Sequence, residues 1–505
     1  MTTYALRTYR SDEPLAREDQ LAFRLARLAA SAPAPEADVL DMVINRVIDN
    51  AAVAAASLAR APVAAARDMA LRHPHAPGAS VVGVGGVRVS PEWAAWANGV
   101  AVRELDFHDT FLAAEYAHPG DNIPAILALA QHAHERGLSG ADVARAIAVS
   151  YEVQIDLCRS VSLHSHHIDH VAHLGPSIAA GLGALVGLSP EVTFHAIGQA
   201  LHTTTATRQS RKGEISTWKA YAPAFASKVA IEALDRAMRG QTSPTPIYEG
   251  DNGVIAVLLD GPSAAYEVDL PEPGAPTRAI LDSFTKAYSA EYQAQAWIDL
   301  ARRLHVEHPE LRDPANVEEI VLHTSHHTHV VIGSGANDPQ KSDPHASRET
   351  LDHSIAYILA VALQDGTWHH EHSYARSRAT RPDTVALWHK VRTVEDAEWS
   401  RRYLSLDPAE RAFGGRLEAH LVDGSRIVAE IAVPDAHPLG AAPFARAQYI
   451  EKFRSLASDV LAEDEIERFL EVAQRLDTLA SAELSELSFD ASDFLADVEP
   501  THGII

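Results

Sequence analysis

Acid–base side chains are concentrated in one segment of the sequence, between Asp106 and Asn122. Asp106 and Thr110 lie four residues apart, so they would share a face if this part of the segment were helical. The run HPGDN, from His118 to Asn122, predicts a turn, which can present side chains and backbone amides to a cleft. These residue types suit acid–base chemistry on a polar substrate. The alternative is a surface loop capped by its own Asp and Asn side chains.

A basic cluster follows further along the chain. Arg208, Arg211 and Lys212 are close in sequence, and Lys219 stands beside Trp218 after a short loop. Arginine binds carboxylates through two parallel N–H groups, and lysine acts as a point charge. Because the chain has a formal net charge of −25, these neighbouring cations predict a local pocket for an anion. A solvated charged loop is the alternative.

Histidines are enriched between His164 and His173. Helical spacing would place His166 near His170, an arrangement that can bind zinc. A zinc site takes a defined set of ligands, however, and the surplus here favours a polar turn that enters a helix. A metal-dependent hydrolase is kept as an alternative. Two further groups are expected to be exposed or locally paired: His326, His327 and His329, and His369, His370 and His372.

Two more polar segments are candidates, and the first of them lies where the helical part of the sequence gives way to a mixed part. One runs over residues 283–292 and contains Lys286 and Glu291. The other runs over residues 341–354 and ends in the sequence RETLDHS. Because pockets form preferentially at domain junctions, the position of the first segment favours a site there.

The composition is that of an acidic globular protein, with 43 basic and 68 acidic residues. Such a surface repels nucleic acid and anionic membranes, so neither is expected as a partner. The single cysteine, Cys158, excludes a disulfide framework within the chain and a cluster held by several thiolates, and its apolar neighbours predict burial. The N-terminal sequence lacks the apolar stretch of a signal peptide, and the Ala-rich run 51–66 is too short to cross a bilayer. We expect a cytoplasmic protein.

The elements that must position these residues begin with a helical part, residues 1–275. Leucines recur at helical spacing from residue 21, Ser139 can cap a helix that runs to Cys158, and Ser189 with Pro190 can open another. The Ala/Gly-rich run 177–188 suits close helix packing, and a further helix is predicted over 222–238. Residues 80–90 predict a small β-hairpin rather than a nucleotide-binding loop, because Arg88 stands where a third glycine would be needed.

The second part, residues 276–437, is predicted to be α+β. Residues 317–322 are typical of a strand, and alternation on either side of Asp423-Gly424 predicts a hairpin, with a buried helix over 351–363 before it. Residues 438–505 return to helices, over 444–457 and 466–479, with an exposed acidic tail from residue 481. The expected fold is mainly α: a large all-helical domain, to which the C-terminal helices return, and a smaller α+β lid domain.

Several of these segments together resemble the MmgE/PrpD family. The run DFHDT from Asp106, with AEYAHPGDN up to Asn122, resembles the signature segment of that family. Further matches are the run DHV from Asp169 before the Ala/Gly-rich helix, the run RETLDHS, and Lys286 with Glu291. Their order and spacing support coverage of nearly the whole chain. One departure is His108, because the family usually has an acid or an amide there.

The resemblance implies a homodimer that acts on a small tricarboxylate without a metal or iron–sulfur cofactor. It is strongest to members that dehydrate 2-methylcitrate, and we expect that reaction, with His118 and His170 as acid and base. Alternatives on the same scaffold are decarboxylation of cis-aconitate and hydration or dehydration of citrate, and a binding protein without catalysis is a further one. The catalytic positions carried over are Asp106, Thr110, His118, His170, Lys219 and Lys286. The expected substrate-binding positions are Arg208, Lys212, Asn122 and Glu291.

Overall fold

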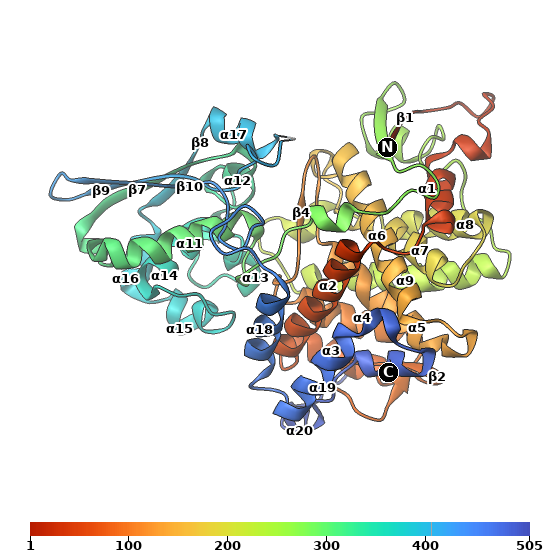
Figure 1. Ribbon diagram of the computed structural model, residues 1–505. Helices are drawn as coiled ribbons and strands as arrows, with labels where there is room; N and C mark the ends of the chain where they lie inside the picture. Colours follow the sequence, from red (N-terminus) through yellow and green to blue (C-terminus); the bar gives the residue numbers. More distant parts are fainter. Residues whose placement is uncertain (406, 505) are drawn as a thin grey trace.

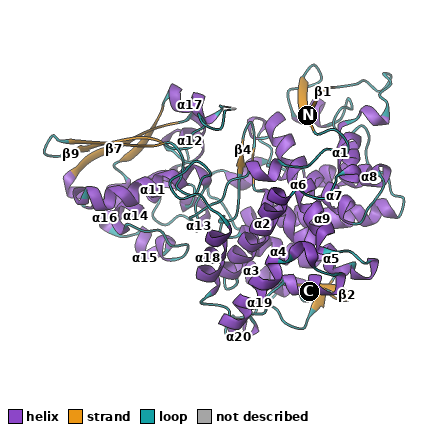
Figure 2. Cartoon of the chain, viewed as in Figure 1, coloured by secondary structure: helices purple, strands orange, loops and turns teal. Residues whose placement is uncertain are grey.

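Apolar residues at helical spacing build most of the molecule. The computed structural model describes residues 1–405 and 407–504, and helices dominate it while strands are few and short (Figure 2). The predicted mainly α fold is confirmed. A larger helical body and a smaller body built around a sheet lie beside each other, each with its own hydrophobic core (Figure 1).

The larger body joins the apolar faces of its helices in one core. In α1, Leu21, Leu25 and Leu28 recur at helical spacing and are buried. Two predicted helix starts are confirmed, because the side chains of Ser139 and Ser189 each accept a backbone N–H from the first turn of their helix. The helices of this body are α1 (Leu21–Ser31), α2 (Ala37–Ser57), α3 (Ala61–Ala70), α4 (Pro91–Arg103), α5 (Ile123–His132), α6 (Gly140–Ser160), α7 (Val171–Leu185), α8 (Pro190–Thr204), α9 (Trp218–Met238) and α10 (Val254–Leu258).

The Ala/Gly-rich run does permit close helix packing. A Cβ added at Gly181 in α7 would lie 1.9 Å from Ser150 Oγ in α6, so only glycine fits between these helices. Three short antiparallel pairs complete the larger body. They are β1 (Thr2–Arg7) with β6 (Ala265–Leu270), β2 (Pro74–Ser80) with β3 (Arg88–Val89), and β4 (Phe111–Leu112) with β5 (Tyr116–Ala117).

The smaller body is α+β, with a sheet of strand order β10-β9-β7-β8 in which β7 and β8 are parallel and the other pairs are antiparallel. The predicted strand and hairpin are confirmed as β7 and as β9 with β10. In Figure 1 the sheet lies above α11, α14 and α16. The strands are β7 (Val317–Thr324), β8 (Val391–Glu395), β9 (Gly415–Leu421) and β10 (Arg426–Ile431). The helices are α11 (Tyr292–Glu307), α12 (His326–Val331), α13 (Arg348–Leu351), α14 (Ile355–Asp365), α15 (Arg376–Ala379), α16 (Pro382–Trp388) and α17 (Ala397–Tyr403).

The chain then returns to the larger body. Helix α18 (Arg446–Ala457) packs on α2, and α19 (Glu463–Gln474) and α20 (Ser492–Leu495) follow it (Figure 1). Side chains of α18 and α19 belong to the core of the larger body. The expectation of an exposed tail after residue 481 is wrong in part, because Leu484, Leu487 and Phe489 are buried against that core.

Three local predictions are corrected. Strands β2 and β3 pair at the ends of the predicted hairpin, and the residues between them form a loop. The helix predicted over 351–363 is interrupted: α13 ends at Leu351, and α14 begins at Ile355 after a cap by Ser354. The segment from Asp106 to Thr110 is not helical, since Asp106 has a φ of 49° and β4 begins directly afterwards.

Two expectations from composition concern burial. Cys158 is fully buried in α6, as predicted. Within residues 1–405 and 407–504, no single helix has the length and apolar character needed to cross a membrane, although the bent pair α2 and α3 meets that test by length and composition.

Candidate active site

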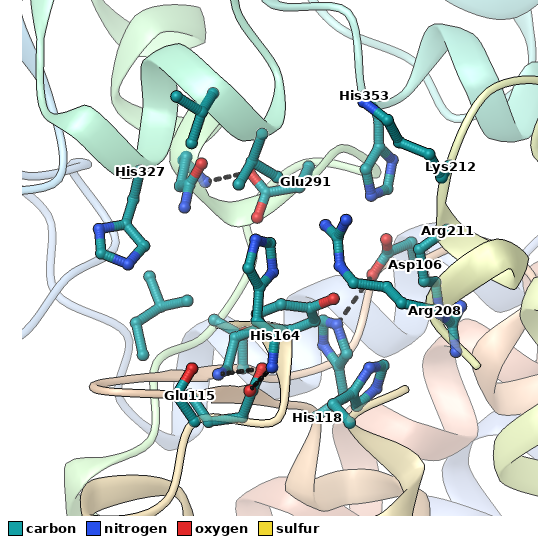
Figure 3. Close-up of a pocket in the computed structure, with 18 of the residues that line it drawn as sticks. Asp106, Glu115, His118, His164, Arg208, Arg211, Lys212, Glu291, His327 and His353 are labelled. Carbon is teal, nitrogen blue, oxygen red and sulfur yellow. Dashed lines mark hydrogen bonds and ion pairs between the residues drawn. The ribbon is translucent and has the colours of Figure 1, made fainter. Parts of the chain in front are cut away.

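A cavity lies where the two bodies meet, and both contribute side chains to it (Figure 3). The larger body supplies Asp106, Glu115 and His118 from the segment between α4 and α5, and basic residues from the loop between α8 and α9. The smaller body supplies Glu291 at the start of α11 and His353 between α13 and α14. The site therefore depends on how the two bodies are held together.

Asp106 holds a set of buried cations at the base of the cavity. Its Oδ1 accepts hydrogen bonds from Arg103 Nη1 at 2.6 Å and Lys286 Nζ at 2.5 Å, and its Oδ2 lies 3.0 Å from Lys219 Nζ. Burial alone would raise the pKa of this carboxyl, but Arg103, Lys219 and Lys286 outweigh burial and hold the pKa well below its usual range. Asp106 is therefore ionised and is a weak base.

His118 is neutral and offers one free ring nitrogen. Its Nδ1 lies 3.0 Å from the backbone oxygen of Asp109, so Nδ1 carries the proton and donates it to that carbonyl. Nε2 then has the lone pair, 3.8 Å from Asp106 Oδ1. Burial lowers the pKa of His118 well below its usual value, and the charges of Arg103 and Lys286 lower it further. This geometry is that of a general base.

Asp109 and Gly120 fix the position of the His118 loop. Asp109 accepts hydrogen bonds from Tyr151 Oη and from the backbone N–H of Gly120, both at 2.8 Å, and Arg46 Nε lies 3.4 Å from it. A Cβ added at Gly120 would lie 2.7 Å from Asn50 Oδ1 and 2.8 Å from Asp109 Oδ1. Glycine is therefore required for this close approach. The alternative of an exposed loop is wrong, because the whole run from His118 to Asn122 is buried.

His170 faces His118 across 5.7 Å between ring centroids. Its Nδ1 lies 3.1 Å from Asp169 Oδ1, and Asp169 is also 3.3 Å from Arg211 Nε. Burial lowers the pKa of His170, and Asp169 offsets this only in part. His170 is therefore neutral near pH 7, as His118 is.

Two carboxyl groups in the cavity have raised pKa values. Burial raises the pKa of Glu115 to about 7 and that of Glu291 to about 7. Glu115 accepts backbone N–H groups from His164 at 2.5 Å and Tyr116 at 3.1 Å. Glu291 accepts one, from Gln293 at 2.6 Å. Each carboxyl can hold or release a proton near neutral pH.

Cations from the basic loop line the other side of the cavity. Arg208, Arg211 and Lys212 approach from one direction in Figure 3. Lys212 Nζ crosses to the smaller body, where it lies 2.8 Å from Asp338 Oδ1 and donates to the Ala336 carbonyl at 2.6 Å. Together with Arg103 and Lys219 these residues give a strongly acidic chain a cavity suited to an anion with several carboxylates.

A lysine side chain already lies between the two carboxylates that could bind a metal ion at this site. Among residues 1–405 and 407–504, the set of three ligands close enough to share an ion is Asp106, Asp352 and His353. Lys219 Nζ lies 2.7 Å from Asp352 Oδ2 as well as near Asp106, so its ammonium occupies that position. In the 164–173 segment, His166 bonds to Ser162 and Asp260 and His173 to the Val161 carbonyl, so the helical pairing of His166 with His170 that suggested zinc is not formed among the described residues.

Most of the sequence-predicted residues come together at this cavity. Those that line it are Asp106, Thr110, His118, His170, Arg208, Lys212, Lys219 and Glu291. The Thr110 hydroxyl donates to the Ala117 carbonyl at 3.0 Å and so holds the β4–β5 turn. Lys286 lies behind Asp106, fully buried, rather than on the cavity wall.

Asn122 is a correction to the predicted substrate-binding set. Its amide donates to Pro119 O and to Gln154 Oε1, and its Oδ1 accepts from Ser177 Oγ. All of these bonds are internal, and Asn122 does not line the cavity. Its role in the structure is to tie the HPGDN turn to α6 and α7.

Sequence reasoning missed several lining residues. Arg103 precedes the signature segment, and its side chain turns back toward it. His327 was expected to be exposed or locally paired, yet it lines the cavity from α12, opposite His164 (Figure 3). Tyr403 was missed too, whereas four further lining residues belong to segments that the sequence marked as candidates without giving these residues a role: Glu115, His164, Lys341 and His353. The RETLDHS run was a usable signal for His353, whereas nothing in the sequence pointed to His327 or Tyr403.

Fold and site together define a mainly helical protein of two bodies with a polycarboxylate-type cavity between them. The profile of the MmgE/PrpD N-terminal domain matches residues 23–267, and that of the MmgE/PrpD C-terminal domain matches residues 288–478. The chain belongs to the MmgE/PrpD family.

Three of the similar curated proteins are named for the same activity. The chain is 28% identical over 371 residues to the mitochondrial 2-methylcitrate dehydratase of Yarrowia lipolytica, covering 70% of this chain and 67% of that protein. It is 28% identical to the 2-methylcitrate dehydratase of Cupriavidus necator, covering 70% and 72%. It is 26% identical to that of Escherichia coli K12, covering 67% and 69%.

Proposed function

We propose that this protein is a hydro-lyase that removes water from 2-methylcitrate to give 2-methyl-cis-aconitate, a step of propionate catabolism by the methylcitrate cycle. The observation that carries the proposal is the pairing of a neutral His118, with Nε2 free, with a cation-lined cavity in an acidic chain. The names of the relatives support the same reaction.

The chemistry requires a base, carboxylate-binding cations and a proton for the leaving oxygen. His118 Nε2 removes the proton from the carbon that bears the methyl group and a carboxylate. The electron pair of that C–H bond forms the C=C bond, and the neighbouring C–O bond breaks, so that the hydroxyl leaves as water once it has gained a proton. Lys219 and Arg208, with Lys212, hold the carboxylates and stabilise the enediolate charge that develops at the carboxylate beside the reacting carbon.

The direct test is to incubate the purified protein with 2-methylcitrate and, separately, with citrate, each with and without a chelator. Ultraviolet absorbance follows the conjugated alkene. Product from 2-methylcitrate that resists the chelator and forms faster than product from citrate is the expected result. A methyl group changes discrimination by only about 1–3 kcal/mol, so slower conversion of citrate is compatible with the proposal.

Assays on the same purified protein distinguish the rival reactions. No alkene from either substrate would overturn the proposal, and carbon dioxide release from cis-aconitate would then identify a decarboxylase. Binding of the tricarboxylates without turnover would identify a binding protein.

Three further features belong to the proposal and come from the family resemblance. They are catalysis without a cofactor, a homodimer and a cytoplasmic location. Activity after dialysis against a chelator tests the first, and light scattering of the purified protein tests the second. Fractionation of cells that express the chain tests the third.

A further inference from the structure

Glu291 is a half-buried carboxyl group that lines the cavity without a cationic partner. It stands at the N-cap of α11 and accepts one hydrogen bond, from the backbone N–H of Gln293 to Oε2. Within residues 1–405 and 407–504, no Lys, Arg or His nitrogen lies within 4.0 Å of its carboxylate, and its Oε1 has no hydrogen-bond partner. Lys286, five residues earlier, is instead bound to Asp106.

The two histidines leave the mechanism without a proton donor, and the Glu291 carboxyl group can supply one. A general acid must hold a proton before the C–O bond breaks. His118 and His170 both have lowered pKa values, so both are neutral and neither holds a transferable proton of the imidazolium kind. The Lys219 ammonium is held between Asp106 and Asp352.

We propose that Glu291 is the proton donor to the leaving hydroxyl, and that it takes up this proton when a tricarboxylate binds. This inference rests on the proposed function and adds a catalytic residue from the smaller body. The balance is complete: His118 gains the proton from carbon, the protonated Glu291 loses its proton to the departing oxygen, and water is released. The proton on His118 then returns to Glu291 by way of solvent before the next turnover.

The negative charge of the substrate explains why its binding favours the protonated form of Glu291. A carboxyl that is partly withdrawn from water and has no cationic partner favours its neutral form, and each substrate carboxylate placed nearby strengthens that preference. Glu291 enters the cavity from the smaller body, whereas His118 enters from the larger one (Figure 3). The titratable groups that act on Glu291 are Lys286, Asp106, Asp352, Tyr292 and Tyr403. Lys286 opposes protonation, but its charge is already shared with Asp106.

Glu115 is the matched control, because it is the other raised carboxyl of the cavity. It accepts two backbone N–H groups and thereby holds the turn that begins at His164. Its role is to position that turn. A Gln side chain at either position is isosteric and can still accept a backbone N–H, so Glu291→Gln and Glu115→Gln are expected to fold, which circular dichroism checks.

The first experiment changes the leaving group. An analogue of 2-methylcitrate with fluorine in place of the hydroxyl loses fluoride, which needs no proton. We expect Glu291→Gln to lower kcat on 2-methylcitrate by about 10²–10⁴-fold and to lower it far less on the fluoro analogue. Glu115→Gln should lower kcat by the same factor on both substrates. Equal losses on both substrates in Glu291→Gln would overturn the assignment, since that pattern marks a positioning role.

The second experiment does not depend on turnover. Propane-1,2,3-tricarboxylate has no hydroxyl to lose, and its binding enthalpy can be measured by calorimetry in buffers of different ionisation enthalpy. We expect the wild-type protein to take up protons when it binds this ligand at pH 7, and we expect this uptake to be about half a proton smaller in Glu291→Gln. The reason is that a group titrating near the working pH is about half protonated before binding. Unchanged uptake would overturn the inference. A wild-type protein that takes up the proton yet fails to dehydrate 2-methylcitrate would instead refute the proposed function alone.

Discussion

Lys452 carries the strongest structural prediction, because one buried ammonium joins three segments of the site. It comes from α18, and its Nζ donates to Asp49 Oδ1 at 2.6 Å, to the Phe107 carbonyl at 2.7 Å and to the Lys286 carbonyl at 2.9 Å. Phe107 follows Asp106 in the chain, and the Lys286 side chain binds the Asp106 carboxylate. The C-terminal helices therefore hold together the two chain segments that build the base of the cavity.

The magnitude follows from burial. The side chain of Asp49 is 0% exposed and that of Lys452 is 6% exposed. Removing one partner of a buried pair leaves an uncompensated charge and costs about 3–5 kcal/mol, whereas an exposed pair contributes about 0–1 kcal/mol. We expect Lys452→Met to lower the free energy of unfolding by about 3–5 kcal/mol. In Lys452→Met with Asp49→Asn, which removes both charges, a large part of this loss should be recovered, because no buried charge is then left alone.

Urea unfolding followed by tryptophan fluorescence measures this double-mutant cycle, and turnover is measured in the same preparations. Displacement of the Phe107 and Lys286 carbonyls should lower kcat by up to about 10²-fold in the single variant. A loss below about 1 kcal/mol in Lys452→Met, or additive losses in the double variant, would refute the reasoning that Lys452 acts as a buried clamp.

The remaining predictions concern the cavity itself. His118→Ala should lower kcat by about 10²–10⁴-fold with an unchanged circular dichroism spectrum, and near-normal turnover would reject it as the base. Gly120→Ala should lower the melting temperature and turnover together, because its Cβ would lie 2.7 Å from Asn50 Oδ1; a stable, active variant would contradict that packing. If Glu291 must be protonated and has a pKa of about 7 in the free protein, kcat/KM should fall about tenfold per pH unit above that value, and a profile flat to pH 9 would disagree. Arg208→Gln should raise KM more than it lowers kcat, since the arginine lines the cavity at its basic side; steady-state kinetics decide between these.

Much of the fold could be predicted because local signals and tertiary structure agree. Ser139 and Ser189 start helices by the same side-chain bonds that the sequence suggests. One failure lies close to the site. The helix predicted over 351–363 breaks at residues 352–354, where Asp352 lies 2.7 Å from Lys219 Nζ. Apolar periodicity does not report such a break, whereas Ser354, which caps α14, was a local signal for it.

The candidate site was predictable as far as its chemistry lies in contiguous motifs. His118 stands in a recognisable run, but its lowered pKa comes first from burial and then from Arg103 and Lys286, and only the fold supplies both. His327 and Tyr403 enter from the smaller body, and their approach to the cavity depends on how the two bodies pack. No spacing in the chain encodes that approach.

The surroundings of Asp106 decide which residue is the base. Arg103, Lys219 and Lys286 all contact its carboxylate, so its pKa lies well below the usual range and it removes a proton from carbon poorly. Its φ of 49° is unfavourable by about 1–2 kcal/mol, which the contacts to these cations offset. The carboxylate thus fixes the positions of the cations. Burial lowers the pKa of His118, and Arg103 and Lys286, two of these cations, lower it further, so the histidine is neutral and ready to accept a proton.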